Sequence, residues 1–240
     1  LIGFAFALYF VIGPIGVVLG YAFSFMPFVI KRYKSYRISK KEFSLLKEKI
    51  PFMRDSYGHS ILSVFGTYAD KLIVGPLFGF AFLGNYQLAF QILMILTMIS
   101  GIVFTYLLPQ EASGKPHRKL WLITILIIIV SSILTIVLAP SVLPILMPKY
   151  VPAIDLIQIM SIAAVSMTIT LRYTSKFLGN EKSKIVIIGK AIYLASHIVG
   201  IFSIGTEWGI QGVAISFVIA SSIEAFYFVT INRILNNKLK

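Results

Sequence analysis

The chain has 240 residues, of which 58% are hydrophobic and 13% are charged, and its mean hydropathy is +0.88. A soluble domain could not cover this much apolar surface, and a disordered chain needs the opposite composition, so both classes are excluded. The formal net charge of +13 comes from basic residues clustered between apolar runs, a pattern typical of membrane proteins rather than of nucleic-acid-binding proteins. Cysteine is absent, which excludes disulfides and thiolate metal sites.

The first 30 residues are apolar throughout, which is too long for one untilted helix across a hydrocarbon core of about 30 Å. Gly13-Pro14 is a natural break, so we interpret residues 1–12 as the tail of one span and residues 14–30 as the next. One long kinked helix is the alternative. The chain starts inside this apolar run without a basic segment or a cleavage site, which indicates a truncated chain whose upstream part is missing, not a signal peptide.

A strongly basic segment follows, with eight Lys and Arg residues between positions 31 and 49. We interpret residues 31–54 as a cytoplasmic linker between two helical bundles, with residues 1–30 as the end of the first bundle. This linker is either an ordinary positively charged loop or a helix that lies on anionic lipid head groups.

Six further apolar segments are each long enough to span a membrane: residues 55–77, 83–108, 120–139, 153–172, 185–204 and 209–230. None has the period-2 alternation of a membrane β-barrel. The predicted fold class is therefore all-α, a polytopic membrane helix bundle of about seven spans plus a leading partial span. Residues 55–230 would form a six-helix C-terminal bundle and residues 231–240 a tail.

The distribution of basic residues predicts the orientation. All Lys and Arg residues lie in alternate loops or in the tail, except Lys71, Lys149 and Lys190. Basic loops stay on the cytoplasmic side, so we expect a multi-pass protein of the cell membrane with a cytoplasmic C-terminus.

Asp70 and Lys71 are the most informative charges, because they lie about 22 Å along their span at about 1.5 Å per residue. An ionisable group at such depth costs about 2.5–3.5 kcal/mol on insertion scales and is a functional candidate. Ser63 and Thr67 continue the same polar face, as expected of a helix that lines a hydrated cavity. The alternative is that the two charges only lock the packing; direct mutual pairing is not expected, because adjacent residues point about 100° apart on a helix.

Lys190 and Glu224 lie at matched depth from the cytoplasmic side on consecutive helices, so we predict an ion pair between them, although Lys190 could instead extend to the interface. His197, near mid-span, could carry a proton or could be a hydrogen-bonded packing residue. Asp155 and Gln158 share a face at the outer start of their span and are interpreted as interfacial.

Motifs of enzymes are missing from the sequence. It has no glycine-rich phosphate loop, no HExxH motif and no paired catalytic carboxylates, and its three histidines are scattered. We therefore expect no enzymatic activity, no cofactor and no metal site.

Four short motifs resemble those of a known family in order along the chain: Tyr68–Gly75 (YADKLIVG), Leu83–Ala89 (LGNYQLA), Leu146–Ala153 (LMPKYVPA) and Trp208–Ala214 (WGIQGVA). They resemble the acidic–basic pair of the seventh helix, the start of helix eight, the entry to helix ten and the opening of the last helix in polysaccharide-transporter (O-antigen-type) flippases. This family belongs to the multidrug/oligosaccharidyl-lipid/polysaccharide exporter superfamily. The resemblance runs from helix six to the end of the chain, with Lys71 where arginine is more usual and Met147 where glycine is more usual.

The resemblance implies a transporter of two six-helix bundles around a central cavity, of which this chain supplies the second bundle. Its cargo would be a polyprenyl-phosphate-linked oligosaccharide for polysaccharide biosynthesis, flipped by alternating access, and its partners would be membrane lipids and the missing N-terminal bundle. Lys71 would attract the pyrophosphate, and Asp70 would hold that lysine or take part in ion coupling. The alternatives are a cation-coupled multidrug exporter of the same superfamily, a lipid II-type flippase, or a membrane scaffold that transports nothing.

Overall fold

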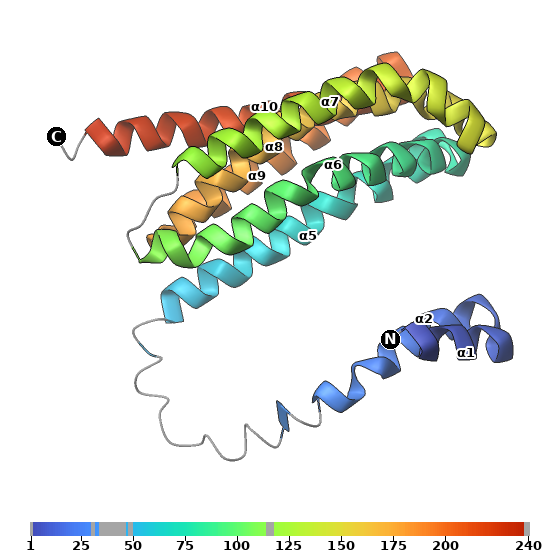
Figure 1. The fold of residues 1–240 in the computed structure, drawn as a ribbon, viewed down its shortest axis with the longest axis horizontal. Coiled ribbons are helices and arrows are strands. Elements are labelled where there is room, and N and C mark those ends of the chain that lie inside the picture. Colours follow the sequence, from blue (N-terminus) through green and yellow to red (C-terminus); the bar gives the residue numbers. More distant parts are fainter. Residues whose placement is uncertain (1, 30–31, 34–46, 48–49, 114–117, 238–240) are drawn as a thin grey trace. The chain divides into compact units, whose positions relative to one another are not determined.

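The structure is a computed structural model that describes residues 2–29, 32–33, 47, 50–113 and 118–237 (Figure 1). Every regular element in these residues is a helix, in agreement with the predicted all-α class. The chain divides into two compact units, Leu1–Pro51 and Phe52–Lys240. Most of the predicted basic linker, and the last residues of the tail, lie outside the described residues.

The first unit contains a helical hairpin. Helix α1 (Ile2–Ile12) and helix α2 (Pro14–Ser24) meet at Gly13, which has a φ of 68° that favours glycine. Pro14 starts α2 without losing a hydrogen bond, because the first N–H groups of a helix have no partner within it. Gly16 then packs directly on the backbone of Leu8, so the two helices fold against each other and do not form one kinked helix.

In the predicted span at residues 14–30, the structure has an apolar helical stretch over Ile15–Val29. This stretch extends to the last described residue before position 30, so the predicted span stays a prediction.

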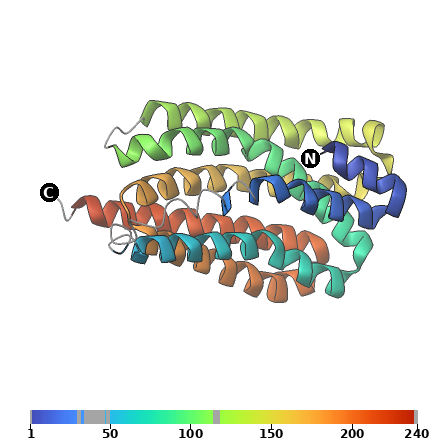
Figure 2. The same cartoon turned by 90° about the horizontal axis from the view of Figure 1, so that it is seen from below.

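The second unit contains six α-helices, which run alongside one another in alternating directions (Figures 1 and 2). They are α5 (Ile50–Phe78), α6 (Phe80–Ala112), α7 (Arg118–Leu146), α8 (Ile154–Gly179), α9 (Ser183–Gly200) and α10 (Thr206–Asn237). A short 3₁₀ helix, η2 (Pro148–Ala153), precedes α8, and a π-helical turn, η3 (Ile201–Gly205), follows α9.

Five continuous helical stretches in the described residues are long and apolar enough to cross a membrane: Met53–Phe78, Phe80–Ala112, Lys119–Leu146, Pro148–Gly179 and Ser183–Asn237. The last stretch contains α9, η3 and α10, and a backbone break at Gly209, with φ 60° and ψ −143°, lies within the first turn of α10. A Cβ added at Gly205 would contact Val213, at Gly200 it would contact Ser216, and at Gly189 it would contact Phe228. These contacts join residues progressively further apart in sequence, so α9 and α10 form an antiparallel hairpin.

The predicted end of the third long span, residues 120–139, is wrong, because α7 continues through Pro140 and Pro144. Pro140 has no N–H to donate to the carbonyl of Ile136, which would leave that carbonyl unsatisfied in the hydrocarbon. Gln158 of α8 takes over this role, with its Nε2 donating to Ile136 O at 2.8 Å. Gln158 is therefore a contact between two helices, where the sequence suggested an interfacial residue.

Helices α6, α8 and α10 make the centre of the second unit. Their facing sides carry small and aromatic residues that are almost fully buried, among them Ala89, Ala163, Ala214 and Phe217. Helix α7 packs outside this centre on α6 and α8, and α9 packs on α10. The outer side of α7 is apolar and exposed, as a helix in contact with lipid requires.

Candidate functional site

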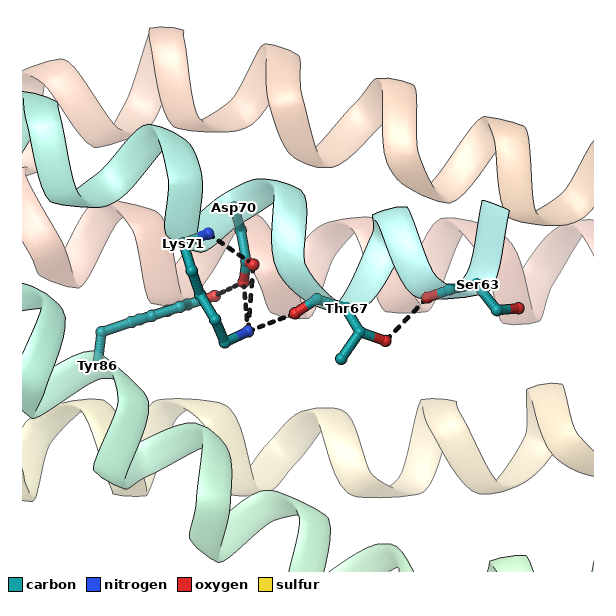
Figure 3. A network of polar contacts seen from close by, with 5 residues as sticks. All are labelled: Ser63, Thr67, Asp70, Lys71 and Tyr86. Carbon is teal, nitrogen blue, oxygen red and sulfur yellow. Dashed lines mark hydrogen bonds and ion pairs between the residues drawn. The ribbon is translucent and has the colours of Figure 1, made fainter. Parts of the chain in front are cut away.

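The Asp70 carboxylate is the most deeply buried charge of α5, with a side chain that is 1% exposed. It accepts a hydrogen bond of 2.6 Å from the hydroxyl of Tyr86 on α6, and one of 2.8 Å from the backbone N–H of Lys71 (Figure 3). The glycine at position 79, with φ 93°, turns the chain between α5 and α6 and so brings Asp70 and Tyr86 together. Asp70 thus joins two consecutive helices.

Lys71 pairs with its sequence neighbour, so the expectation that these two residues would not pair directly is wrong. Its Nζ lies 3.2 Å from Asp70 Oδ1 and 3.4 Å from Asp70 Oδ2, and it donates to the carbonyl of Thr67 at 2.5 Å (Figure 3). The long lysine side chain folds back along its own helix toward Thr67, and this closes the angular gap that separates adjacent residues.

The Lys71 ammonium is also covered by an aromatic ring, with Nζ 3.6 Å from the centroid of Phe90 on α6. An ammonium group has three N–H donors, and three acceptor atoms surround this one. In the arrangement that the structure describes, the Lys71 ammonium is therefore held by Asp70 and Thr67 and covered by Phe90.

The two polar residues that precede Asp70 on the same face have different surroundings. Thr67 donates its hydroxyl to Ser63 O at 2.8 Å and lines a cavity. Ser63 takes part in this contact through its backbone carbonyl. The expected polar face of α5 therefore reaches a cavity at Thr67.

That cavity has a volume of about 330 Å³ and lies among α5, α6, α8, α9 and α10. Gly66 and Thr67 contribute from α5, Phe90 from α6, Lys190 from α9 and Glu224 from α10. At Gly66, α5 faces side chains of α9, because a Cβ there would lie 3.3 Å from both Lys190 and Tyr193. Phe90 belongs both to the cavity wall and to the surroundings of Lys71, so it separates the Asp70–Lys71 pair from the cavity.

The structure brings Lys190 and Glu224 together across the α9–α10 hairpin, with 3.7 Å between Nζ and Oε2. Their side chains are 21% and 6% exposed. The Lys190 ammonium also lies 4.4 Å from the ring centroid of Tyr193, one turn further along α9. This second ion pair is looser than the first and faces the cavity.

His197 lies apart from both ion pairs, in the contact between α9 and α10. Its ring centroid is 5.7 Å from that of Tyr193 and 5.3 Å from that of Phe217, and only 2% of the residue is exposed. Within the described part of the chain its Nε2 has no hydrogen-bond partner. Aromatic rings surround His197 in this arrangement, and no described contact joins it to Asp70 or Glu224.

Sequence reasoning missed Tyr86 and Phe90, the two α6 residues that surround the first ion pair. The sequence does contain a signal for them, because a turn at Gly79 places the residues that follow it opposite Asp70 and Lys71.

Among the described residues, no group of three His, Cys, Asp or Glu side chains could hold a metal ion. Comparison with known proteins adds no further assignment, since no family model, no curated protein and no solved structure matches the chain. The functional argument therefore rests on the two ion pairs and the cavity.

Proposed function

We propose that the chain is part of a membrane transporter of the polysaccharide-transporter type, which flips a polyprenyl-phosphate-linked oligosaccharide across the cell membrane by alternating access. The observation that carries the proposal is the placement of four ionisable side chains inside apolar helices, two of them on a cavity: Asp70, Lys71, Lys190 and Glu224. Such groups are costly in a bilayer and are retained where a transport path or its coupling needs them.

In this proposal each of the six helices α5–α10 crosses the membrane once, and α1 and α2 are the end of a first bundle. The alternating directions of the helices and the α9–α10 hairpin support this count. The basic loops and the C-terminus then lie on the cytoplasmic side. The partners are membrane lipids, the lipid-linked sugar and the other bundle.

Asp70 and Lys71 act in this proposal as a lock between α5 and α6. Alternating access requires contacts that exist in one state and break in another. The Asp70–Lys71 pair meets this requirement, because its carboxylate binds Tyr86 and its ammonium lies over Phe90. Moving α5 against α6 would separate Asp70 from Tyr86 and Lys71 from Phe90. Direct binding of pyrophosphate by Lys71 is the alternative role, and it would require the ammonium to leave its contacts with Asp70 and Thr67.

The experiment uses the full-length protein in liposomes and follows a fluorescent polyprenyl-diphosphate sugar across the membrane. We compare wild type, Lys71→Ala and the charge-free pair Asp70→Asn/Lys71→Met, with Lys149→Ala as a control in the exposed η2 segment. Wild type and the control should transport, whereas both changes at the pair should abolish transport without loss of inserted protein. Normal transport by the charge-free pair would refute the lock, and a wild type without translocation would refute the flippase.

A cation-coupled exporter of small organic cations is the second candidate. One observation favours it: the cavity wall combines the Glu224 carboxylate with the rings of Phe90, Tyr193 and Phe217 and with flexible methionines. Lys190 opposes it, because an ammonium in the same cavity repels a cationic ligand. Uptake of a fluorescent organic cation by the same liposomes, without sugar translocation, would favour the exporter. A non-transporting scaffold would tolerate loss of both ion pairs.

A further inference from the structure

All residues that line the cavity belong to helices of the second unit. Five of the six helices contribute to its wall, and its volume is about 330 Å³. Ligand sites in proteins span about 300–1,000 Å³, so this cavity is at the small end of the range. It has room for one small polar molecule and not for an oligosaccharide with its lipid.

The polar groups of the cavity have hydrogen-bonding capacity that their protein contacts do not use. Lys190 Nζ and Glu224 Oε2 are 3.7 Å apart, beyond the range of about 2.7–3.2 Å for a hydrogen bond. Thr170 lines the cavity, but its hydroxyl oxygen is buried within the protein and is not reached from the cavity. Polar groups in a buried site are normally satisfied, so the Lys190–Glu224 pair suits an occupant that both donates and accepts hydrogen bonds.

The charge balance excludes phosphate as this occupant. Lys190 is the positive group on the cavity wall, and the carboxylate of Glu224 neutralises it at 3.7 Å. Lys71, behind the wall, is neutralised by Asp70 at 3.2 Å. A phosphate would therefore meet no net positive charge, and it would be repelled by Glu224 in a medium of low dielectric constant.

The remaining wall suits a ring with an apolar face. Tyr193 and Phe217 pack edge to face at 6.1 Å, and Phe90 packs edge to face on Phe217 at the same separation. The three rings form one aromatic wall beside the ion pair. A sugar ring has C–H groups on its faces and hydroxyls, each both donor and acceptor, around its edge.

We propose that this cavity binds a single uncharged sugar residue, with its hydroxyls on Lys190 and Glu224 and its ring against the aromatic wall of Phe90, Tyr193 and Phe217. The inference rests on the proposed function, because it assigns the sugar part of the lipid-linked cargo, and not its phosphate, to this cavity. The ion pair is then a ligand site: sugar hydroxyls complete the hydrogen bonds that the acid and the base do not make with each other.

The first measurement is calorimetric titration of the full-length protein in lipid nanodiscs. The probes are the methyl glycosides of glucose, galactose and N-acetylglucosamine, with inorganic pyrophosphate as the charged comparison. We expect saturable binding of at least one glycoside and none of pyrophosphate. Saturable pyrophosphate binding, or failure of all three glycosides to bind, would overturn the proposal.

Variants locate the binding in the cavity. Glu224→Gln and Lys190→Met each remove one charge of the ion pair with little change of side-chain volume, so both test polar contacts. Each should weaken glycoside binding by about tenfold or more, whereas Ser222→Ala, on the exposed side of α10, should not. Wild-type affinity in both Glu224→Gln and Lys190→Met would place the binding elsewhere and refute the site.

A thiol probe provides a second readout, because the chain contains no cysteine. Met167→Cys introduces a thiol on the cavity wall. Ser166→Cys introduces one at the preceding position of α8, which does not line the cavity. A small thiosulfonate reagent should modify both, and the bound glycoside should slow modification at position 167 only. Equal rates with and without glycoside, or a thiol at 167 that the reagent never reaches, would contradict an open sugar site.

These results separate the inference from the proposed function. Translocation of the lipid-linked sugar without glycoside binding would refute the cavity site and leave the flippase intact. Glycoside binding without translocation would leave the site intact and refute the flippase.

Discussion

The Asp70–Lys71 pair allows a quantitative test of how a buried charge pair stabilises the bundle. The perturbation is a double-mutant cycle of Asp70→Asn and Lys71→Met, which removes each charge with little change of volume. The cycle measures the coupling because the two side chains contact each other directly, at 3.2 and 3.4 Å.

The expected magnitudes follow from what each variant leaves behind. Removing one member of a buried pair costs about 3–5 kcal/mol. Lys71→Met should cost about 3 kcal/mol, at the low end, because the carboxylate keeps the Tyr86 hydroxyl and a backbone N–H. Asp70→Asn should cost about 2 kcal/mol, since the ammonium keeps the Thr67 carbonyl and the face of Phe90, a contact worth up to about 2 kcal/mol when desolvated.

The double variant should lie within about 1 kcal/mol of wild type, because replacing a buried pair by neutral groups is often nearly neutral. The coupling free energy is the sum of the two single losses minus the loss in the double variant, and it is then about 4 kcal/mol.

The assay is reversible unfolding in bicelles, followed by steric trapping with two biotin labels and monovalent streptavidin. Lys149→Met, an exposed residue of η2, should change the free energy of unfolding by less than about 0.5 kcal/mol and serves as control. If the loss in the double variant equals the sum of the two single losses to within about 0.5 kcal/mol, the charges do not interact. That result would refute the lock.

Three further predictions test other contacts. Gln158→Leu should lower the free energy of unfolding by about 1–3 kcal/mol, because it leaves the Ile136 carbonyl of α7 without a hydrogen bond. Pro140→Ala should suppress most of that loss, because it restores the missing N–H within α7. Steric trapping of the two single variants and the double variant measures both effects, and an unchanged loss in the double variant would refute the role of Gln158. Gly200→Val should prevent the α9–α10 hairpin from closing, since even a Cβ at Gly200 would lie 2.5 Å from a side-chain atom of α10; wild-type resistance to proteolysis in nanodiscs would contradict this. Cysteines at Lys190 and Glu224 should be joined by a short bifunctional reagent, because the native side chains meet at 3.7 Å; reactive thiols that fail to crosslink would exclude this arrangement.

The all-helical membrane class could be predicted from the sequence because it depends on local properties of each segment. Apolar runs must be long enough to cross the bilayer, and backbone groups in hydrocarbon must be satisfied within a helix. The break at Gly13-Pro14 is equally local, since only glycine readily adopts the φ of 68° found there. The contact of Lys190 with Glu224 could be predicted from matched depth on consecutive helices.

The tertiary structure decided the features that depend on a side chain from another helix or on a rotamer. Helix α7 passes through Pro140 only because Gln158, on α8, satisfies the carbonyl of Ile136. Lys71 reaches Asp70 only because its side chain folds back along α5 under Phe90, and no pattern along one helix specifies that conformation. The cavity likewise exists only where five helices meet, since each helix contributes a few wall residues whose neighbours are remote in sequence.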